Sequence, residues 1–137
     1  MKLVFFLSLS NRYINTRKKH GFLMGSNNTV CVGIDDVAIH FPRLYMDMKD
    51  FADLRGEDYG KLNKGLGLKA MSIPDVHEDT ATMGANAVMK LIDRNGLNPR
   101  HIGRMYLGTE SALDGAKPTA TYIVDMLTQR YAERYGA

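Results

Sequence analysis

The residue best suited to chemistry in this sequence is Glu110, within Gly108-Thr109-Glu110-Ser111. The apolar run before it, residues 104–109, is typical of a buried strand, so Glu110 is expected just past the carboxyl-terminal end of that strand. Ligands of open α/β sheets bind outside such strand ends. A carboxylate flanked by small residues and partly withdrawn from water suits general acid–base work. The pattern alone fits a solvated loop acid equally well.

A second candidate is the glycine-rich run at residues 65–70, which fits G-x-G-x-x-A. A dinucleotide-binding fingerprint needs a strand before this run and a helix opening on it. Here a helical turn is expected before the run, and Pro74 follows shortly after it. We therefore interpret the segment as a glycine-hinged loop, and we expect the protein to use no cofactor.

Metal and thiol chemistry have weaker candidates. His77, Glu78 and Asp79 are adjacent, and adjacent residues at a helix entrance rarely converge on one ion. Acids in a first helical turn are already explained by the helix dipole. Cys31 is the single cysteine, and its apolar surroundings favour an inert core thiol, because a reactive thiol needs exposure and nearby positive charge. We expect no metal site.

The element that should support Glu110 is a helix over residues 79–95. Its apolar and small residues recur at helical spacing and so share one face: Ala81, Gly84, Ala85, Val88, Leu91 and Ile92. Gly84 and Ala85 indicate that another element packs close to this face. Asn95-Gly96 supplies a left-handed stop.

Other segments have recognisable signals as well. Strands are expected at residues 30–41, 68–73 and 104–109. Asp47 is the expected cap of a short helix over residues 48–54, and Asp58 of another over residues 59–64. Asn98-Pro99 predicts a single turn, and a longer helix should run from Thr119 to about Tyr131. Alternating strands and helices indicate an α/β fold with a mixed or parallel sheet.

Composition and charge limit the class of protein. The chain has 137 residues, 45% of them hydrophobic, which indicates a single globular domain or part of one. The net charge is +3, yet five of the 18 basic residues and none of the 15 acidic residues lie within residues 1–26. The remainder is slightly acidic, which argues against nucleic-acid binding. No apolar stretch is long enough for a membrane span.

Residues 1–26 differ from the rest of the chain. They combine a short apolar run with a basic segment, as in a weak secretory signal, but no small-residue cleavage site follows. We favour a disordered or mis-annotated leader over a signal peptide, and we expect limited proteolysis to remove it near Met24. Residues 27–137 are then the folded domain.

Several separated motifs stand out along the chain. The longest is GRMYLGTESALDGAKPTAT, residues 103–121. The others are Lys64-Gly65-Leu66-Gly67, IPDVHEDTATM at residues 73–83 and VGIDD at residues 32–36. These motifs resemble those of 3-hydroxy-3-methylglutaryl-CoA synthases, most closely the archaeal and bacterial branch, and the longest resembles the segment around the catalytic glutamate of that family. Together these motifs cover roughly residues 30–129 in the family's order.

The resemblance implies a thiolase-like fold, of which this chain supplies part of the first half, with a mixed sheet and packed helices. It implies a cytoplasmic homodimer that condenses acetyl-CoA with acetoacetyl-CoA in the mevalonate route to isoprenoids, with an acetoacetyl-CoA thiolase as a further partner. Glu110 would be the general acid/base. Asp58, Tyr59 and Lys61 align with acyl-CoA contacts, although Tyr59 replaces the family's usual small residue.

The family also uses a nucleophilic cysteine and a histidine that lie after the glutamate, and residues 111–137 contain neither. We therefore expect the chain to be an amino-terminal fragment that is inactive alone, since an acyl-enzyme route needs its nucleophile. Two alternatives stay open. One is a non-catalytic thiolase-like scaffold or interaction protein, and the other is a related β-ketoacyl condensing enzyme.

Overall fold

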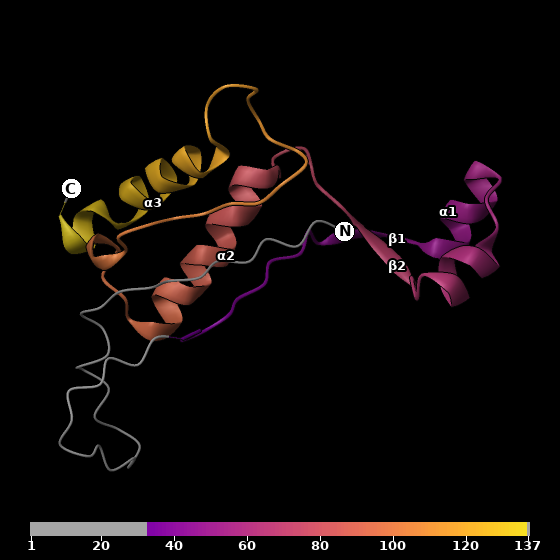
Figure 1. Ribbon diagram of the computed structural model, residues 1–137, viewed down its shortest axis with the longest axis horizontal. Helices are drawn as coiled ribbons and strands as arrows, with labels where there is room; N and C mark the ends of the chain where they lie inside the picture. The colour runs from indigo at the N-terminus through magenta and orange to yellow at the C-terminus, as the bar shows by residue number, and fades with distance from the viewer. Residues whose placement is uncertain (1–32, 137) are drawn as a thin grey trace, which may run out of the picture.

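A computed structural model of the chain describes residues 33–136 (Figure 1). The helices are α1 (Met48–Arg55), α2 (Thr80–Asn95) and α3 (Thr119–Tyr135), with a π-helical turn η1 (Lys61–Gly65) and a 3-10 turn η2 (Pro99–His101). The strands are β1 (Leu44–Asp47) and β2 (Ala70–Ile73). Residues 1–32 and 137, which include the expected leader and Cys31, lie outside the described residues.

Helix α2 is the centre of the fold, and its predicted limits are confirmed. Asp79 accepts a hydrogen bond from the Thr82 amide, and the Thr82 hydroxyl accepts one from the Asp79 amide, which completes a capping box. Gly96, at φ +59°, ends the helix in the left-handed conformation. The predicted small-residue face, including Gly84 and Ala85, is buried.

The core lies between α2 and α3. Ile92 of α2 and Ile123 of α3 are fully buried, and Leu127 packs in the same cluster. The Tyr131 hydroxyl donates to Asp93 at 2.9 Å, which fastens the end of α3 to the end of α2. Helix α3 runs to Tyr135 and is therefore slightly longer than predicted.

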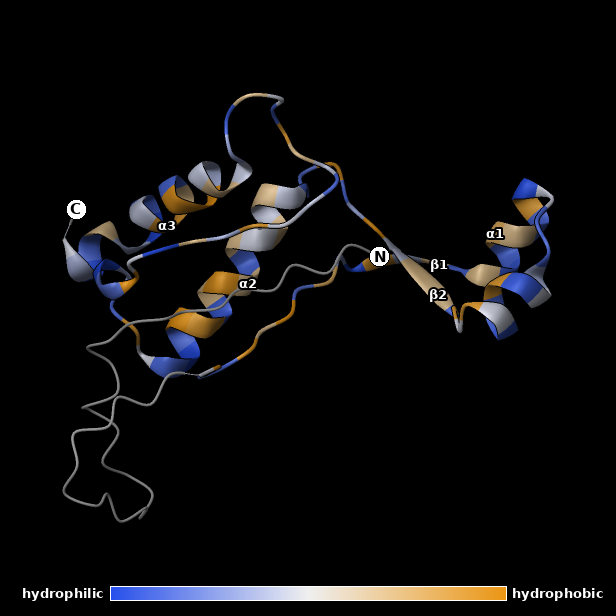
Figure 2. Cartoon of the chain, in the orientation of Figure 1, coloured by the Kyte–Doolittle hydropathy of each residue, from blue (hydrophilic) through white to orange (hydrophobic). Residues whose placement is uncertain are grey.

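Two predicted strands, residues 30–41 and 104–109, are not formed among the described residues. Residues 34–42 and 102–109 are extended but belong to no sheet. Both lie along α2 (Figure 1) and carry hydrophobic residues (Figure 2), with Ala38 in the core and Met105 and Leu107 packed against it. A strand needs a ladder partner, and the helix surface offers these two segments side-chain packing in its place.

The sheet that does form has two antiparallel strands, in which Leu44 pairs with Ile73 and Asp47 with Ala70. Its strands are joined by a long connection that contains α1 and η1, and the pair is called the hairpin below. The expectation of a mixed or parallel sheet is therefore wrong for residues 33–136. The hairpin reaches out from the α2–α3 body and carries α1 at its far end (Figure 1). Helix α1 has the predicted Asp47 cap and Gly56 stop. None of the described helices has the length and apolar character to cross a membrane.

Candidate active site

The loop that contains Glu110, residues 110–118, is anchored to the first turns of α2 and α3. The Thr80 hydroxyl, at the start of α2, donates to the Ser111 carbonyl at 2.7 Å. The Ser111 amide donates to the Thr109 hydroxyl at 3.0 Å. The Leu113 amide donates to the hydroxyl of Thr119, at the start of α3, at 3.4 Å. The backbone after Glu110 is thus tied to both helices although it has no regular structure.

Asp114 organises the second half of this loop. Its carboxylate accepts hydrogen bonds from the amides of Ala116 at 2.8 Å and Lys117 at 3.2 Å, and from the Tyr122 hydroxyl at 3.4 Å. These bonds, the Ala116 amide first, hold the pKa of Asp114 below its ordinary value. The Lys117 ammonium lies 4.2 Å from the centre of the Tyr122 ring. Asp114 is therefore a structural carboxylate.

Glu110 itself is exposed, and it follows an extended segment that is not part of a sheet. The expectation that it comes directly after a buried strand and is partly withdrawn from water is wrong for the described residues. The physical reason is the same as for the missing strands, because no neighbouring strand covers residues 104–109. A carboxylate in this position can exchange protons with a bound substrate once other groups enclose it.

A cavity of about 420 Å³ lies beside the loop, between residues 105–109 and 112–120. Thr109 and Ala112, which flank Glu110 and Ser111, both line it, and so does Asp114. It is an opening of mixed polarity next to the candidate acid/base.

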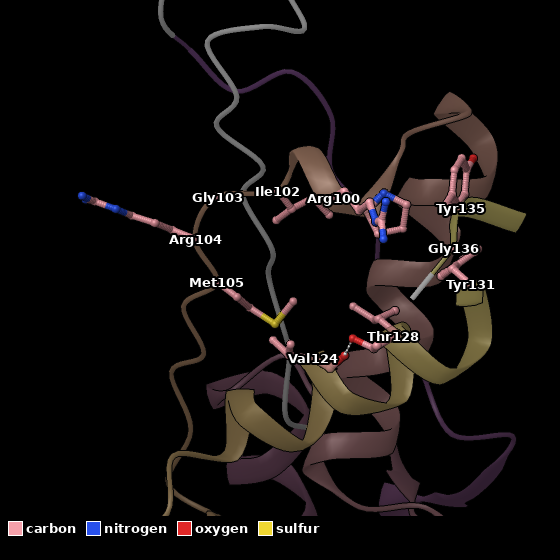
Figure 3. Close-up of a pocket in the computed structure, with 12 residues that line it drawn as sticks. Arg100, Ile102, Gly103, Arg104, Met105, Val124, Thr128, Tyr131, Tyr135 and Gly136 are labelled. Carbon is pink, nitrogen blue, oxygen red and sulfur yellow. Dashed lines mark hydrogen bonds between the residues drawn. The ribbon is translucent and has the colours of Figure 1, made fainter. Parts of the chain in front are cut away.

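A second cavity, of about 460 Å³, lies between residues 99–105 and α3. Figure 3 shows Met105 pointing towards Val124 of α3, whereas Arg104 points away from the groove. These two neighbouring side chains therefore face opposite sides, as in a strand, even without a ladder.

The three predicted substrate-binding residues share one helical turn. Asp58 caps it, because its carboxylate accepts from the Gly60 amide at 2.7 Å. A Cβ atom at Gly60 would lie 3.1 Å from that carboxylate oxygen, so glycine leaves room for the cap. Tyr59 is 39% exposed. Lys61 begins η1, and its carbonyl accepts from the Leu66 amide at 3.1 Å, the spacing of a π-helical turn.

These residues and Glu110 are not brought together in residues 33–136. The turn with Asp58, Tyr59 and Lys61 packs on α1 at the far end of the hairpin, whereas the loop with Glu110 joins the α2–α3 body (Figure 1). The chain therefore presents two separate groups of candidate residues.

Within the sequence His77-Glu78-Asp79, Glu78 and Asp79 have structural roles. Glu78 accepts from the Asp75 amide at 3.0 Å and contacts His40 at 3.4 Å, and these partners, the amide first, hold its pKa below the ordinary value. Asp79 caps α2. Among residues 33–136 no three acidic, histidine or cysteine side chains gather in a metal-binding arrangement. Sequence reasoning missed the pairing with His40, which no local pattern signals.

Comparison with solved structures defines the class of protein. The structure of MvaS in complex with 3-hydroxy-3-methylglutaryl coenzyme A is similar to this chain, with a TM-score of 0.57 and 35% sequence identity over 66% of the chain. The described residues therefore form part of a thiolase-like α/β enzyme fold. The chain covers 22% of that protein.

Sequence comparison defines the family. A family model described as hydroxymethylglutaryl-coenzyme A synthase N terminal matches residues 28–133, and the chain belongs to this family.

The curated relatives described next are also hydroxymethylglutaryl-CoA synthases. The hydroxymethylglutaryl-CoA synthase of Haloferax volcanii is 52% identical over 73% of the chain. That of Archaeoglobus fulgidus is 35% identical over 70% of the chain. The matched region is 23% of the first relative's length and 28% of the second's, so this chain spans about a quarter of the relatives it matches.

Proposed function

We propose that this chain forms the amino-terminal part of a hydroxymethylglutaryl-CoA synthase and supplies its general acid/base, Glu110. The observation that supports this most is the loop of Glu110: it lies in the region that matches the family, and Thr80 and Thr119 fix its backbone to two helices. A base held on rigid elements can meet a substrate proton in a reproducible geometry.

The chemistry requires one group that removes a proton and later returns it. In the proposed reaction the Glu110 carboxylate takes a methyl proton from an acetyl group bound as a thioester to the enzyme. The carbanion attacks the ketone carbon of acetoacetyl-CoA, and the new alkoxide takes up the proton from Glu110. Water then hydrolyses the enzyme thioester and frees hydroxymethylglutaryl-CoA. A positioned carboxylate performs both proton transfers.

Asp58, Tyr59 and Lys61 are proposed to hold the CoA portion. Lys61 would meet a CoA phosphate as a point charge, and Asp58 keeps its turn in place through the Gly60 amide. The phosphates of a CoA thioester lie at the opposite end of the pantetheine arm from the reacting acyl group. A phosphate contact remote from Glu110 is therefore consistent with one long substrate.

The whole synthase needs more than these 137 residues provide. We propose that the nucleophilic cysteine and the catalytic histidine come from sequence beyond them, and that no cofactor or metal takes part. The proposed working form is a cytoplasmic homodimer, supplied with acetoacetyl-CoA by a thiolase, without nucleic-acid or membrane partners.

The test is synthase turnover by the protein from the complete reading frame that contains these residues. Acetyl-CoA and acetoacetyl-CoA are supplied, and loss of acetoacetyl-CoA is followed. Glu110→Gln should lower kcat by about a hundredfold or more, because a general acid/base contributes on that order. Glu133→Gln is the matched control, since Glu133 is exposed on α3. Equal rates for Glu110→Gln and the unsubstituted protein would contradict the assignment.

The sequence of the complete reading frame and the activity of its product also distinguish the synthase from the two alternatives, a non-catalytic scaffold and a β-ketoacyl condensing enzyme. A frame that continues after Ala137 into an alanine-cysteine motif supports the synthase. A stop codon there, together with a stable expressed product that turns over neither substrate, supports a non-catalytic scaffold. Condensation of acyl groups without release of hydroxymethylglutaryl-CoA would indicate a β-ketoacyl condensing enzyme.

A further inference from the structure

Thr80 and Thr119 are the buried polar residues within residues 33–136, at 5% and 6% exposure. Each is the first residue of its helix, α2 or α3. Both hydroxyls reach the loop of Glu110, Thr80 at the Ser111 carbonyl and Thr119 at the Leu113 amide. The two buried threonine hydroxyls of this part of the chain thus both reach the short segment that follows Glu110, at Ser111 and Leu113.

The contact of Thr80 is the shorter of the two, at 2.7 Å against 3.4 Å. The contact of Thr80 is also closer to Glu110 along the chain, because the carbonyl that it binds belongs to Ser111, the residue directly after Glu110. A hydrogen bond to this carbonyl restricts rotation of the backbone on the carboxyl side of Glu110. The bond is partly buried, so solvent competes with it less than with a bond on the surface.

Thr80 is itself held rigidly. It follows Asp79, which forms the capping box with Thr82, and its neighbour Ala81 is in the core. The hydrogen bond from Thr80 therefore holds the irregular loop of Glu110 in place relative to the amino-terminal end of α2. If Thr80 served only to fill space, a side chain of the same shape without a hydroxyl, such as valine, would replace it without loss of activity.

We propose that Thr80 is a positioning residue for the acid/base Glu110, acting through the Ser111 carbonyl. This inference rests on the proposed synthase function. The hydroxyl touches no substrate, and it sets the direction from which the Glu110 carboxylate meets the methyl proton. Loss of the hydroxyl should lower the rate of proton transfer and leave substrate affinity unchanged, because the CoA-binding residues are on another element.

The experiment compares Thr80→Val, which keeps the shape, with Thr80→Ser, which keeps the hydroxyl, in the protein from the complete reading frame. Thr80→Val should lower kcat by about tenfold with unchanged KM, since a misplacement of about 1 Å can cost on the order of a hundredfold and a smaller displacement costs less. Thr80→Ser should restore most of kcat. Thr128→Val is the matched control: the Thr128 hydroxyl also donates to a backbone carbonyl, that of Val124 at 2.9 Å, but it does so within α3 and contacts no residue of the loop, so its loss should leave kcat unchanged. Thr80→Ala tests the same loss if Thr80→Val fails to fold.

A double-mutant cycle gives the decisive comparison. If Thr80 acts through Glu110, adding Thr80→Val to Glu110→Gln should not lower the residual rate further. An additional loss in that background, a normal kcat for Thr80→Val, or failure of Thr80→Ser to restore kcat would each overturn this inference and leave the proposed function standing. Absence of turnover in the unsubstituted protein would instead overturn the proposed function itself.

Discussion

At the scale of single residues, Tyr131 is the contact that most clearly reports whether α2 and α3 are docked. Its ring is buried and its hydroxyl donates to Asp93. Burial, followed by this hydrogen bond, raises the pKa of Tyr131 from 10.0 to about 12. The folded state therefore favours the neutral phenol. The resulting stabilisation is complete below about pH 10 and is lost as the pH rises through about 12.

We predict that one tyrosine of the protein titrates near pH 12 and that Tyr131→Phe removes this step. The measurement is a spectrophotometric titration of tyrosinate. Tyr106→Phe is the control, because Tyr106 is 71% exposed and its loss should leave the step in place. Tyr131→Phe should also weaken helix docking by about 1 kcal/mol, the usual contribution of such a bond. Absence of a late-titrating tyrosine would contradict the docked geometry.

Individual residues were predictable where their role follows from local sequence. Asp47, Asp79 and Asn98 cap the turns that the sequence predicts, because a cap depends on neighbours within a few positions. The hydrogen bond of Thr80 was not predictable, since its partner Ser111 is 31 positions away. The same holds for His40, whose partner Glu78 is 38 positions away.

At the scale of elements, docking of α3 depends on Ile123. Its side chain is completely buried against α2, whereas the adjacent Val124 is 47% exposed. We predict that Ile123→Ala lowers the free energy of opening α3 by about 2–5 kcal/mol, the range for a buried large-to-small change. Val124→Ala should change it far less. Amide hydrogen exchange across α3, in the protein from the complete reading frame, measures the opening free energy of both variants, and equal protection in the two would contradict this core.

Helices were predicted better than strands for a physical reason. The limits of α2 follow from its own caps and periodicity, so they were found within one residue. Residues 30–41 and 104–109 have strand composition, but a strand also requires a partner that composition does not identify. The strand predicted at residues 68–73 formed as Ala70–Ile73 because its partner, Leu44–Asp47, is present.

At the scale of the whole molecule, residues 33–136 leave much apolar surface in water. The exposed large apolar side chains are spread over residues 34–124, and they include Ile34 at 68%, Leu54 at 75% and Tyr106 at 71%. Residues 102–109 also offer a strand-like backbone outside any sheet. Such edges and patches favour association with other chains.

We predict that residues 24–137, purified alone, bind a hydrophobic dye or elute as aggregate, and melt without a cooperative transition. Size-exclusion chromatography and thermal denaturation test this directly. A monodisperse monomer with a sharp transition would show a self-sufficient domain and would favour the scaffold alternative over the synthase.

Helix α2 is also the element to which distant parts of the chain attach by side chains. Asp36 accepts a hydrogen bond from Arg94, 58 positions away, and Lys90 of the same helix donates to the Ile39 carbonyl. Closing such a long loop costs more entropy than docking α3, which follows α2 after a shorter connection. In kinetic terms, α2 and α3 should therefore nucleate folding, and residues 36–39 should join late and detach first during unfolding.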